Sequence, residues 1–289
     1  MKGYYNMDLT SPRTIRNIQE QFGFTFKKGL GQNFLTARNI LEEIVDAAEI
    51  ESGVIEVGPG FGVLTSELAQ NSDKVVTIEI DERLIDVLDY TLAEYDNVKI
   101  INEDILKLDL KKVIDDEFNG EKVSIAANLP YYITTPIITK LLEEKLPIKN
   151  IVVMVQKEVA DRMQVGPGTK DYGALSLAVQ YYAKPEIVAN VPPNCFIPRP
   201  NVGSAVIRLD RYAEPPVQTL DEQFMFSVIR ASFNQRRKTL VNGLSNAPGL
   251  NVSKEKIKEM LARMELSEPV RGETLTLEQF AQLADLLRG

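Results

Sequence analysis

The sequence predicts an α/β fold: a mostly parallel sheet covered by helices, followed by a small α-helical domain. Three observations favour this fold. Apolar strand-like segments alternate with helix-like segments between residues 53 and 155, which is typical of a parallel sheet. A glycine-rich turn follows the first strand, and a polar residue follows each of the next three. Beyond residue 212 the pattern becomes helical alone.

Each strand is predicted from a short apolar, β-branched run bounded by turn residues. The first five expected strands are 53–57, 74–80, 98–102, 122–127 and 150–155. Two more, 185–191 and 204–209, flank a proline-rich loop and need not be parallel to the others. Helices are expected from near Thr36 onward, over 64–70, over 82–95 with Asp81 as N-cap, and over 136–145.

The C-terminal part is expected to form a separate domain. Pro215 and Pro216 mark a linker, and helical patterns follow over 221–240, 253–264 and 277–287. We therefore predict a catalytic domain over 1–211, with an N-terminal arm over 1–35, and an α-helical domain over 212–289.

The composition excludes several kinds of chemistry. The 289 residues include no histidine and one cysteine, Cys195. Catalytic triads with histidine, imidazole bases, His-ligated zinc and an internal disulfide are therefore excluded. No apolar run approaches the roughly 18 residues of a membrane span, and the N-terminus lacks a signal-peptide pattern. We expect a cytoplasmic protein that needs no metal and no membrane.

The distribution of charge matters more than the net charge of −8. Residues 221–289 hold ten basic and nine acidic residues, so the acidic excess lies elsewhere. Local basic patches on an acidic body can still hold RNA phosphates, because distant charges are screened; the alternative is solvated helix faces. The candidate RNA-binding residues are Lys27, Lys28, Arg230, Arg236, Arg237 and Lys238. In a helix, residues 230, 237 and 238 would share one face.

The glycine-rich turn spans 56–62 and reads EVGPGFG. Glycines such as Gly58 and Gly60 let the backbone approach a ligand closely and place a helix N-terminus beside it. The dinucleotide fingerprint requires a third glycine at position 63, where the chain has Val63. A nicotinamide dinucleotide is therefore disfavoured, although an oxidoreductase remains an alternative at this point.

Three further strand ends carry polar residues: Glu79, Asp104 and Asn128. Ligands of parallel sheets bind at the carboxyl ends of the strands, so these side chains are expected to meet. A carboxylate at Glu79 could accept both hydroxyls of a ribose. A carboxylate at Asp104 could accept a hydrogen bond from an adenine amine. Taken singly, each could instead be a helix cap or a loop residue.

The segment Asn128-Leu129-Pro130-Tyr131 suggests methylation of an exocyclic amine. Such an amine is a poor nucleophile because its lone pair is delocalised into the ring. Asn128 Oδ1 and the carbonyl of Leu129 or Pro130 could accept from its two hydrogens and raise its electron density. Tyr131 could stack on the extruded base. The alternative is an Asn-x-Pro turn beside a buried tyrosine.

Six motifs together resemble the KsgA-type family of ribosomal small-subunit adenine dimethyltransferases. They are GLGQNFL (29–35), EVGPGFG (56–62), IEID (78–81), EDIL (103–106), NLPYYITTP (128–136) and FIPRPNVGSAVI (196–207). The resemblance implies a Rossmann-like S-adenosylmethionine-dependent methyltransferase sheet. It also implies that the protein uses S-adenosyl-L-methionine as methyl donor. The implied acceptors are the N6 atoms of two adjacent adenosines near the 3′ end of 16S rRNA, in an immature small ribosomal subunit, and the product is N6,N6-dimethyladenosine.

The resemblance also assigns roles to residues. Asn33 and Leu35 would line the methionine side of the cofactor, and Gly58 and Gly60 would let it approach the backbone. The other implied roles are ribose binding by Glu79, adenine-amine binding by Asp104, contact with methionine and target amine by Asn128, and stacking opposite Tyr131 by Phe196.

Two other readings stay open beside the oxidoreductase. One is the related class that dimethylates an adenine of large-subunit rRNA, which shares the catalytic residues. The other is a non-catalytic RNA-binding assembly factor on the same scaffold, against which the intact motif at 128–131 argues. We expect a monomer, because no heptad pattern or unused apolar stripe is visible.

Overall fold

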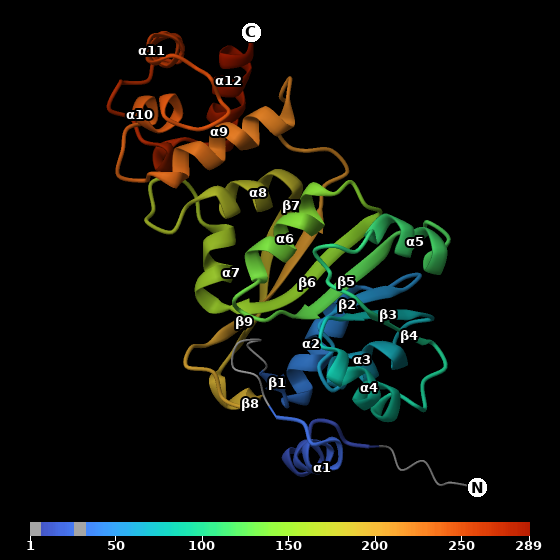
Figure 1. Cartoon of the computed structure of the whole chain (residues 1–289). Coiled ribbons are helices and arrows are strands. Elements are labelled where there is room, and N and C mark those ends of the chain that lie inside the picture. Colours follow the sequence, from blue (N-terminus) through green and yellow to red (C-terminus); the bar gives the residue numbers. More distant parts are fainter. Residues whose placement is uncertain (1–6, 26–32) are drawn as a thin grey trace, which may run out of the picture. The chain divides into compact units, whose positions relative to one another are not determined.

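The computed structural model describes residues 7–25 and 33–289, which form two compact units (Figure 1). The first unit contains Met1–Ala160 and Pro185–Arg211, and the second contains Asp161–Lys184 and Tyr212–Gly289. The chain passes from the first unit to the second between Arg211 and Tyr212, which is also the boundary proposed from the sequence. Residues 161–184 belong to the helical unit, whereas the sequence-based division placed them in the catalytic domain.

A seven-stranded sheet forms the centre of the first unit, in the order β4–β3–β2–β5–β6–β9–β7 (Figure 1). Strands β2 to β6 run parallel, and β9 runs antiparallel to β6. Each strand lies within two residues of its predicted bounds. The strands are β2 (Val54–Val57), β3 (Val75–Glu79), β4 (Val98–Asn102), β5 (Val123–Asn128), β6 (Ile148–Gln156), β7 (Ala183–Val191) and β9 (Ser204–Arg211).

The chain order explains where a ligand can bind. Strands β2, β3 and β4 progress toward one edge, and the chain then returns past β2 to begin β5. Right-handed crossovers place the helices of these two halves on opposite faces of the sheet. The reversal between β2 and β5 opens a crevice at their carboxyl ends. All residues of β2 and β3 are buried, as expected of central strands.

The helices of this unit begin where the predicted signals lie, with two differences. The helix expected over 82–95 is a short 3₁₀ turn and then α4, which ends at Thr91 because the buried Leu92 begins a tight turn. Helices α1, α5 and α7 have no counterpart in the prediction, and α7 begins in this unit and ends in the second. The elements are α1 (Pro12–Phe22), α2 (Arg38–Ala48), α3 (Val63–Gln70), η2 (Glu82–Leu84), α4 (Ile85–Thr91), α5 (Leu110–Phe118), α6 (Thr134–Glu143) and α7 (Lys157–Gln164).

A short two-stranded ladder ties the N-terminal arm to the proline-rich loop. Strand β1 (Phe34–Leu35) pairs antiparallel with β8 (Phe196–Ile197), which follows the 3₁₀ turn η3 (Pro193–Cys195). The backbone N–H and the hydroxyl of Thr36 both donate to the Cys195 carbonyl, at 2.8 and 3.0 Å. The ladder therefore fixes the segment that leads into the crevice.

The second unit is helical within the described residues. Its elements are α8 (Ala174–Tyr182), α9 (Glu222–Asn234), α10 (Leu240–Ser245), α11 (Lys254–Arg263), η4 (Gly272–Thr274) and α12 (Leu277–Arg288). Tyr182 stacks on Phe226 of α9 with ring centroids 5.5 Å apart, and its hydroxyl donates to Glu222 Oε1 at 2.6 Å. This aromatic packing explains why the segment around α8 groups with the tail.

The single helix expected over 221–240 is wrong. Helix α9 ends at Asn234, because Gln235 has non-helical backbone angles (φ −133°, ψ 61°). A new helix, α10, begins after Thr239, whose side chain accepts from the backbone N–H of Asn242 and so caps it. Helices α11 and α12 form as expected, capped by Ser253 and Thr276. No helix of the described chain is long and apolar enough to cross a membrane.

Candidate active site

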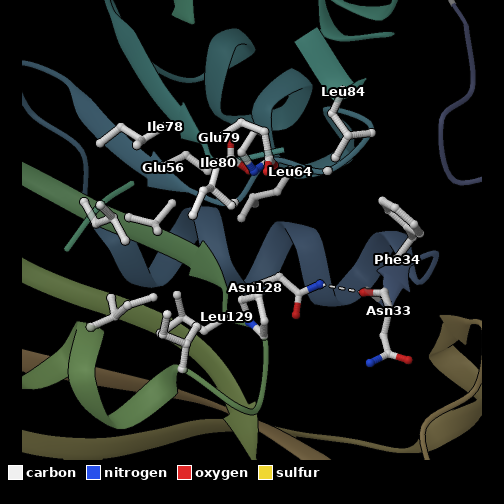
Figure 2. Close-up of a pocket in the computed structure, with 18 of the residues that line it drawn as sticks. Asn33, Phe34, Glu56, Leu64, Ile78, Glu79, Ile80, Leu84, Asn128 and Leu129 are labelled. Carbon is white, nitrogen blue, oxygen red and sulfur yellow. Dashed lines mark hydrogen bonds between the residues drawn. The ribbon is translucent and has the colours of Figure 1, made fainter. Parts of the chain in front are cut away.

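A cavity lies at the carboxyl ends of β2, β3 and β5 (Figure 2). Five segments line it: residues 33–35 of the arm, the glycine-rich turn after β2, the end of β3, the turn after β4, and the segment after β5. The convergence of strand ends expected from the sequence is thus present. Among the predicted residues, the lining includes Asn33, Leu35, Gly58, Gly60, Glu79, Asp104, Asn128, Leu129, Pro130 and Tyr131.

The glycine-rich turn exposes backbone to the cavity. Gly58 and Gly60 have positive φ values of 72° and 60°, which favour glycine. A Cβ on Gly60 would lie 2.6 Å from Cε1 of Phe34, whereas a Cβ on Gly58 would meet nothing within 4 Å. Gly60 therefore makes room for the arm, and Gly58 leaves open space for a ligand. Phe34 in turn stacks on Phe61 with centroids 4.3 Å apart.

The side chain of Asn128 is held by the arm. Its Nδ2 donates to the backbone carbonyl of Asn33 at 3.0 Å, drawn as the dashed line in Figure 2. Since the nitrogen is engaged, Oδ1 is the atom turned away from Asn33, and no described residue donates to it. Asn128 thus presents a fixed acceptor at the edge of the cavity.

The backbone of the same segment selects one of two candidate acceptors. The Pro130 carbonyl already accepts from the Ile133 N–H at 3.2 Å and from the Thr134 hydroxyl at 3.1 Å. A carbonyl has two lone pairs, so this oxygen is fully used. The Leu129 carbonyl is therefore the main-chain oxygen available beside Asn128 Oδ1.

The two predicted stacking aromatics differ in position. Tyr131 lines the cavity, and its hydroxyl hydrogen-bonds with Ser204 Oγ at 2.7 Å. Phe196 is only 1% exposed, does not line the cavity, and pairs with Leu35 in the β1–β8 ladder. In this structure Phe196 supports the arm, and the geometry does not bring its ring to Tyr131.

Two carboxylates at strand ends show different environments. Glu79 is almost fully buried, and burial raises its pKa to about 7 although its Oε1 accepts from the Asp81 N–H at 2.8 Å. Asp104 is more open: its Oδ1 accepts from the Leu106 N–H at 3.0 Å, and Lys107 lies 3.9 Å from Oδ2. Both line the cavity.

A third carboxyl, Glu56, was missed by the sequence analysis. It lies in the floor of the cavity, and burial together with the nearby charge of Glu79 raises its pKa to about 7, against hydrogen bonds from Thr65 and Thr77. These two hydroxyls both donate to Oε2, at 2.5 and 3.2 Å. Its acidic position before the glycines of the turn was the available signal. Within the described residues, no group of three or more histidine, cysteine, aspartate or glutamate side chains is placed to hold a metal ion.

The comparisons with known proteins agree with this geometry. The model of the family "Ribosomal RNA adenine dimethylase" matches residues 23–288. The chain belongs to the ribosomal RNA adenine dimethylase family. A relative from Lachnoclostridium phytofermentans, named ribosomal RNA small subunit methyltransferase A, is 56% identical over 282 residues, or 96% of this chain and 97% of the relative. One of the same name from a Geobacillus strain is 53% identical, over 98% and 99% of the two chains.

Solved structures of a dimethyladenosine transferase and of an rRNA methyltransferase share the fold. A dimethyladenosine transferase from Plasmodium falciparum superposes with a TM-score of 0.69 at 27% identity, covering 86% of this chain and 95% of that one. The 23S rRNA methyltransferase ErmE superposes with a TM-score of 0.64 at 26% identity, covering 89% and 100%. The Rossmann-like methyltransferase fold expected from the motifs is therefore confirmed.

The residues that line the cavity of this adenine dimethylase fit S-adenosylmethionine in three respects: open space, a hydrogen-bond acceptor and an apolar surface. The open space beside Gly58 accommodates a ligand against the backbone, and the buried Glu79 offers an acceptor for hydroxyl groups. Ile80 lines the same cavity and is 54% exposed, an apolar surface that a flat base could cover. Ile80 was not predicted from the sequence as a site residue, although it directly follows Glu79 at the end of β3.

The predicted RNA-binding residues are only partly together. Arg230 lies exposed on α9, while residues 236–238 lie in the turn after that helix, so the predicted shared helical face is wrong. The Arg236 guanidinium donates to the Tyr172 carbonyl at 2.9 Å and lies 3.6 Å from Glu273, which gives it a structural role. Arg237 and Lys238 are exposed. Lys27 and Lys28 lie outside the described residues.

Proposed function

We propose that this protein transfers methyl groups from S-adenosyl-L-methionine to N6 of two adjacent adenosines near the 3′ end of 16S rRNA, giving N6,N6-dimethyladenosine. The observation that carries the proposal is the fixed pair of acceptors, Asn128 Oδ1 and the Leu129 carbonyl, at the edge of a cavity lined by the glycine turn. The names of the 56% and 53% identical relatives favour the small subunit. We further propose that it acts as a cytoplasmic monomer on immature subunits.

The residues around the cavity would hold the cofactor in two parts. Asn33 and Leu35 would contact the methionine portion, beside the exposed backbone of Gly58 and Gly60. Glu79 would accept from the ribose hydroxyls, and Asp104 from the adenine amine. When bound, S-adenosylmethionine supplies a methyl group on a positively charged sulfur.

The acceptors would prepare the target amine. Asn128 Oδ1 and the Leu129 carbonyl each accept one hydrogen of N6, which localises electron density on the nitrogen and orients it. Positioning then provides most of the rate gain, and no imidazole base is needed. Tyr131 offers a partly exposed ring on which the extruded adenine stacks. Stacking by Phe196 would require the loop around β8 to uncover it.

The exposed cations of the second unit would hold rRNA phosphates. Arg230, Arg237 and Lys238 are exposed, and the partly exposed Arg236 also contacts the Tyr172 carbonyl and Glu273. We propose that Lys27 and Lys28 assist them. Phosphate contacts of this kind give affinity without sequence preference, so the cavity has to select the adenosine.

Methyl transfer to defined acceptors tests the proposal. Small subunits from a strain lacking the modification should incorporate label from tritiated S-adenosylmethionine in the 16S rRNA, and protein-free 23S rRNA should incorporate none. Label in 23S rRNA alone would favour the large-subunit activity, which is the activity named for the structural neighbour ErmE. Binding of small subunits without any transfer would favour a non-catalytic assembly factor.

A further inference from the structure

Tyr132 and its neighbour Tyr131 both line the cavity, but their side chains have different surroundings. The Tyr131 hydroxyl points to Ser204 on β9, whereas Tyr132 lies within the electrostatic range of two strand-end carboxylates. Partial burial, and then the negative charges of Asp104 and Glu79, raise the pKa of the Tyr132 phenol. The two consecutive tyrosines thus serve different parts of the site.

Tyr132 contributes little to the buried core. Its side chain is 55% exposed, and its hydroxyl has no hydrogen-bond partner among the described residues. A half-exposed aromatic ring that lines a cavity offers an apolar face that a ligand in the cavity can cover. Tyr132 is thus available to whatever enters the cavity.

The neighbours of Tyr132 indicate which part of a ligand it meets. Glu79 and Asp104 are the acceptors on this side, and Ile80 adds a second apolar surface, 54% exposed, to the same cavity. Two apolar surfaces beside hydrogen-bond acceptors suit a flat heteroaromatic ring that carries an amine and a sugar. The acceptors proposed for the amine of the target adenosine are a different pair, Asn128 Oδ1 and the Leu129 carbonyl.

We propose that Tyr132 is a further cofactor-positioning residue whose ring covers the adenosine half of S-adenosylmethionine on the open side of the cavity. The inference rests on the proposed function, because it assumes that this cofactor binds here. It assigns the ring to the methyl donor and not to the RNA. Its hydroxyl is dispensable in this role, since the contribution comes from the face of the ring.

Calorimetry with the full chain tests the role of the ring. S-adenosylhomocysteine and 5′-methylthioadenosine serve as probes, because the second keeps the adenosine half and lacks the amino acid. Tyr132→Ala should weaken both by about tenfold, or about 1.4 kcal/mol, since the stacking of the base on an aromatic ring is lost. Tyr132→Phe should bind both within about twofold of the wild type. Tyr212→Ala, at an exposed tyrosine that is not among the residues lining the cavity, is the matched control.

A fluorescent reporter gives an independent readout. The chain contains no tryptophan, so Tyr132→Trp introduces a single emitting indole. Saturating 5′-methylthioadenosine should quench and shift its emission, because the adenine ring would stack on it. The same substitution at Tyr212 should leave the emission unchanged by the probe.

The outcomes separate the inference from the proposed function. If the wild type binds neither probe, the assignment of the cofactor fails, and the inference fails with it. If the wild type binds and Tyr132→Ala binds equally well, the inference alone is overturned. An Ala variant with unchanged probe affinity but a raised KM for small subunits would assign the ring to RNA and also overturn it.

Discussion

At the scale of single residues, Asn128 has two separable tasks. Its nitrogen fixes the side chain to Asn33, and its oxygen faces the position proposed for the target amine. Asn128→Ala should lower kcat by at least about a hundredfold, because an aligned acceptor is lost, while S-adenosylhomocysteine still binds measurably by calorimetry. Asn128→Asp should be impaired too, since a carboxylate cannot donate to the Asn33 carbonyl. Wild-type turnover in either variant would remove Asn128 from the mechanism.

The raised pKa of Glu79 predicts pH-dependent cofactor binding. Burial raises this pKa to about 7, so below that pH the side chain is protonated and is a poorer acceptor for ribose hydroxyls. The affinity for 5′-methylthioadenosine, which carries no titrating amino acid, should therefore increase as the pH rises from about 6 to about 8. Calorimetry across this range measures the effect. Glu79→Gln should bind more weakly, with a flatter pH profile; an identical profile would assign the dependence elsewhere.

Glu56 makes a prediction for stability. Its folded-state pKa of about 7 exceeds its ordinary value of 4.5, so the folded protein holds a proton that the unfolded chain releases. The stabilisation by this proton is complete below about pH 4.5 and is lost as the pH rises through about 7. Glu56→Gln keeps an acceptor for Thr65 and Thr77 without the charge. Its Tm should exceed that of the wild type at about pH 8 and differ little at about pH 5.

At the scale of elements, the glycine-rich turn offers a matched pair of substitutions. Both glycines have positive φ, so alanine costs roughly 1 kcal/mol of backbone strain at either position. Gly60→Ala should cost more, because its Cβ would lie 2.6 Å from Phe34, and it should lower Tm further. Gly58→Ala places its methyl group in the cavity and should mainly weaken S-adenosylhomocysteine binding. Denaturation and calorimetry on both variants check this; equal effects would contradict the assigned difference.

The seven strands of the main sheet were predictable from the sequence because each is a run rich in apolar and β-branched residues bounded by turn residues, although β4 and β7 are only partly buried. The helices were less so, because their ends depend on tertiary contacts. Leu92 is buried and ends α4 early, and Thr239 caps a helix that the apolar period alone would have merged with α9. Phe196 shows the same limit for the site. Its motif could be found in the sequence, but its burial as a member of the β1–β8 ladder could not be predicted.

At the scale of the whole molecule, the acidic chain has to bind an acidic polymer. Arg237 and Lys238 are exposed in the turn after α9 and are proposed to contact phosphates. The double reversal Arg237→Glu with Lys238→Glu should weaken binding to 16S rRNA fragments at every sequence. It should also reduce the slope of log K against log salt by about 2. Lys254→Glu with Arg263→Glu, on α11 of the same unit, is the charge-matched control, and an unchanged slope in the Arg237/Lys238 variant would refute the contact.

The site as a whole could be predicted because its residues follow strand ends, and the topology brings strand ends together. Glu79, Asp104 and Asn128 each came from this rule and do line one cavity. The choice between the Leu129 and Pro130 carbonyls could not be made from sequence, since it depends on two hydrogen bonds made by Ile133 and Thr134. The rule considers one polar residue after each strand. It therefore did not predict three further lining residues: Glu56, Ile80 and Tyr132.

The β1–β8 ladder has a consequence for biosynthesis. Thr36 and Cys195 are 159 positions apart, yet their hydrogen bonds hold the arm that carries Asn33 and Leu35. A ribosome synthesising this chain therefore completes the parallel strands β2 to β6 before the arm gains its strand partner, β8. The proposed cofactor site is completed late in translation, because a nascent chain that ends short of β8 can hold the arm through contacts such as the Asn128–Asn33 hydrogen bond but lacks the ladder.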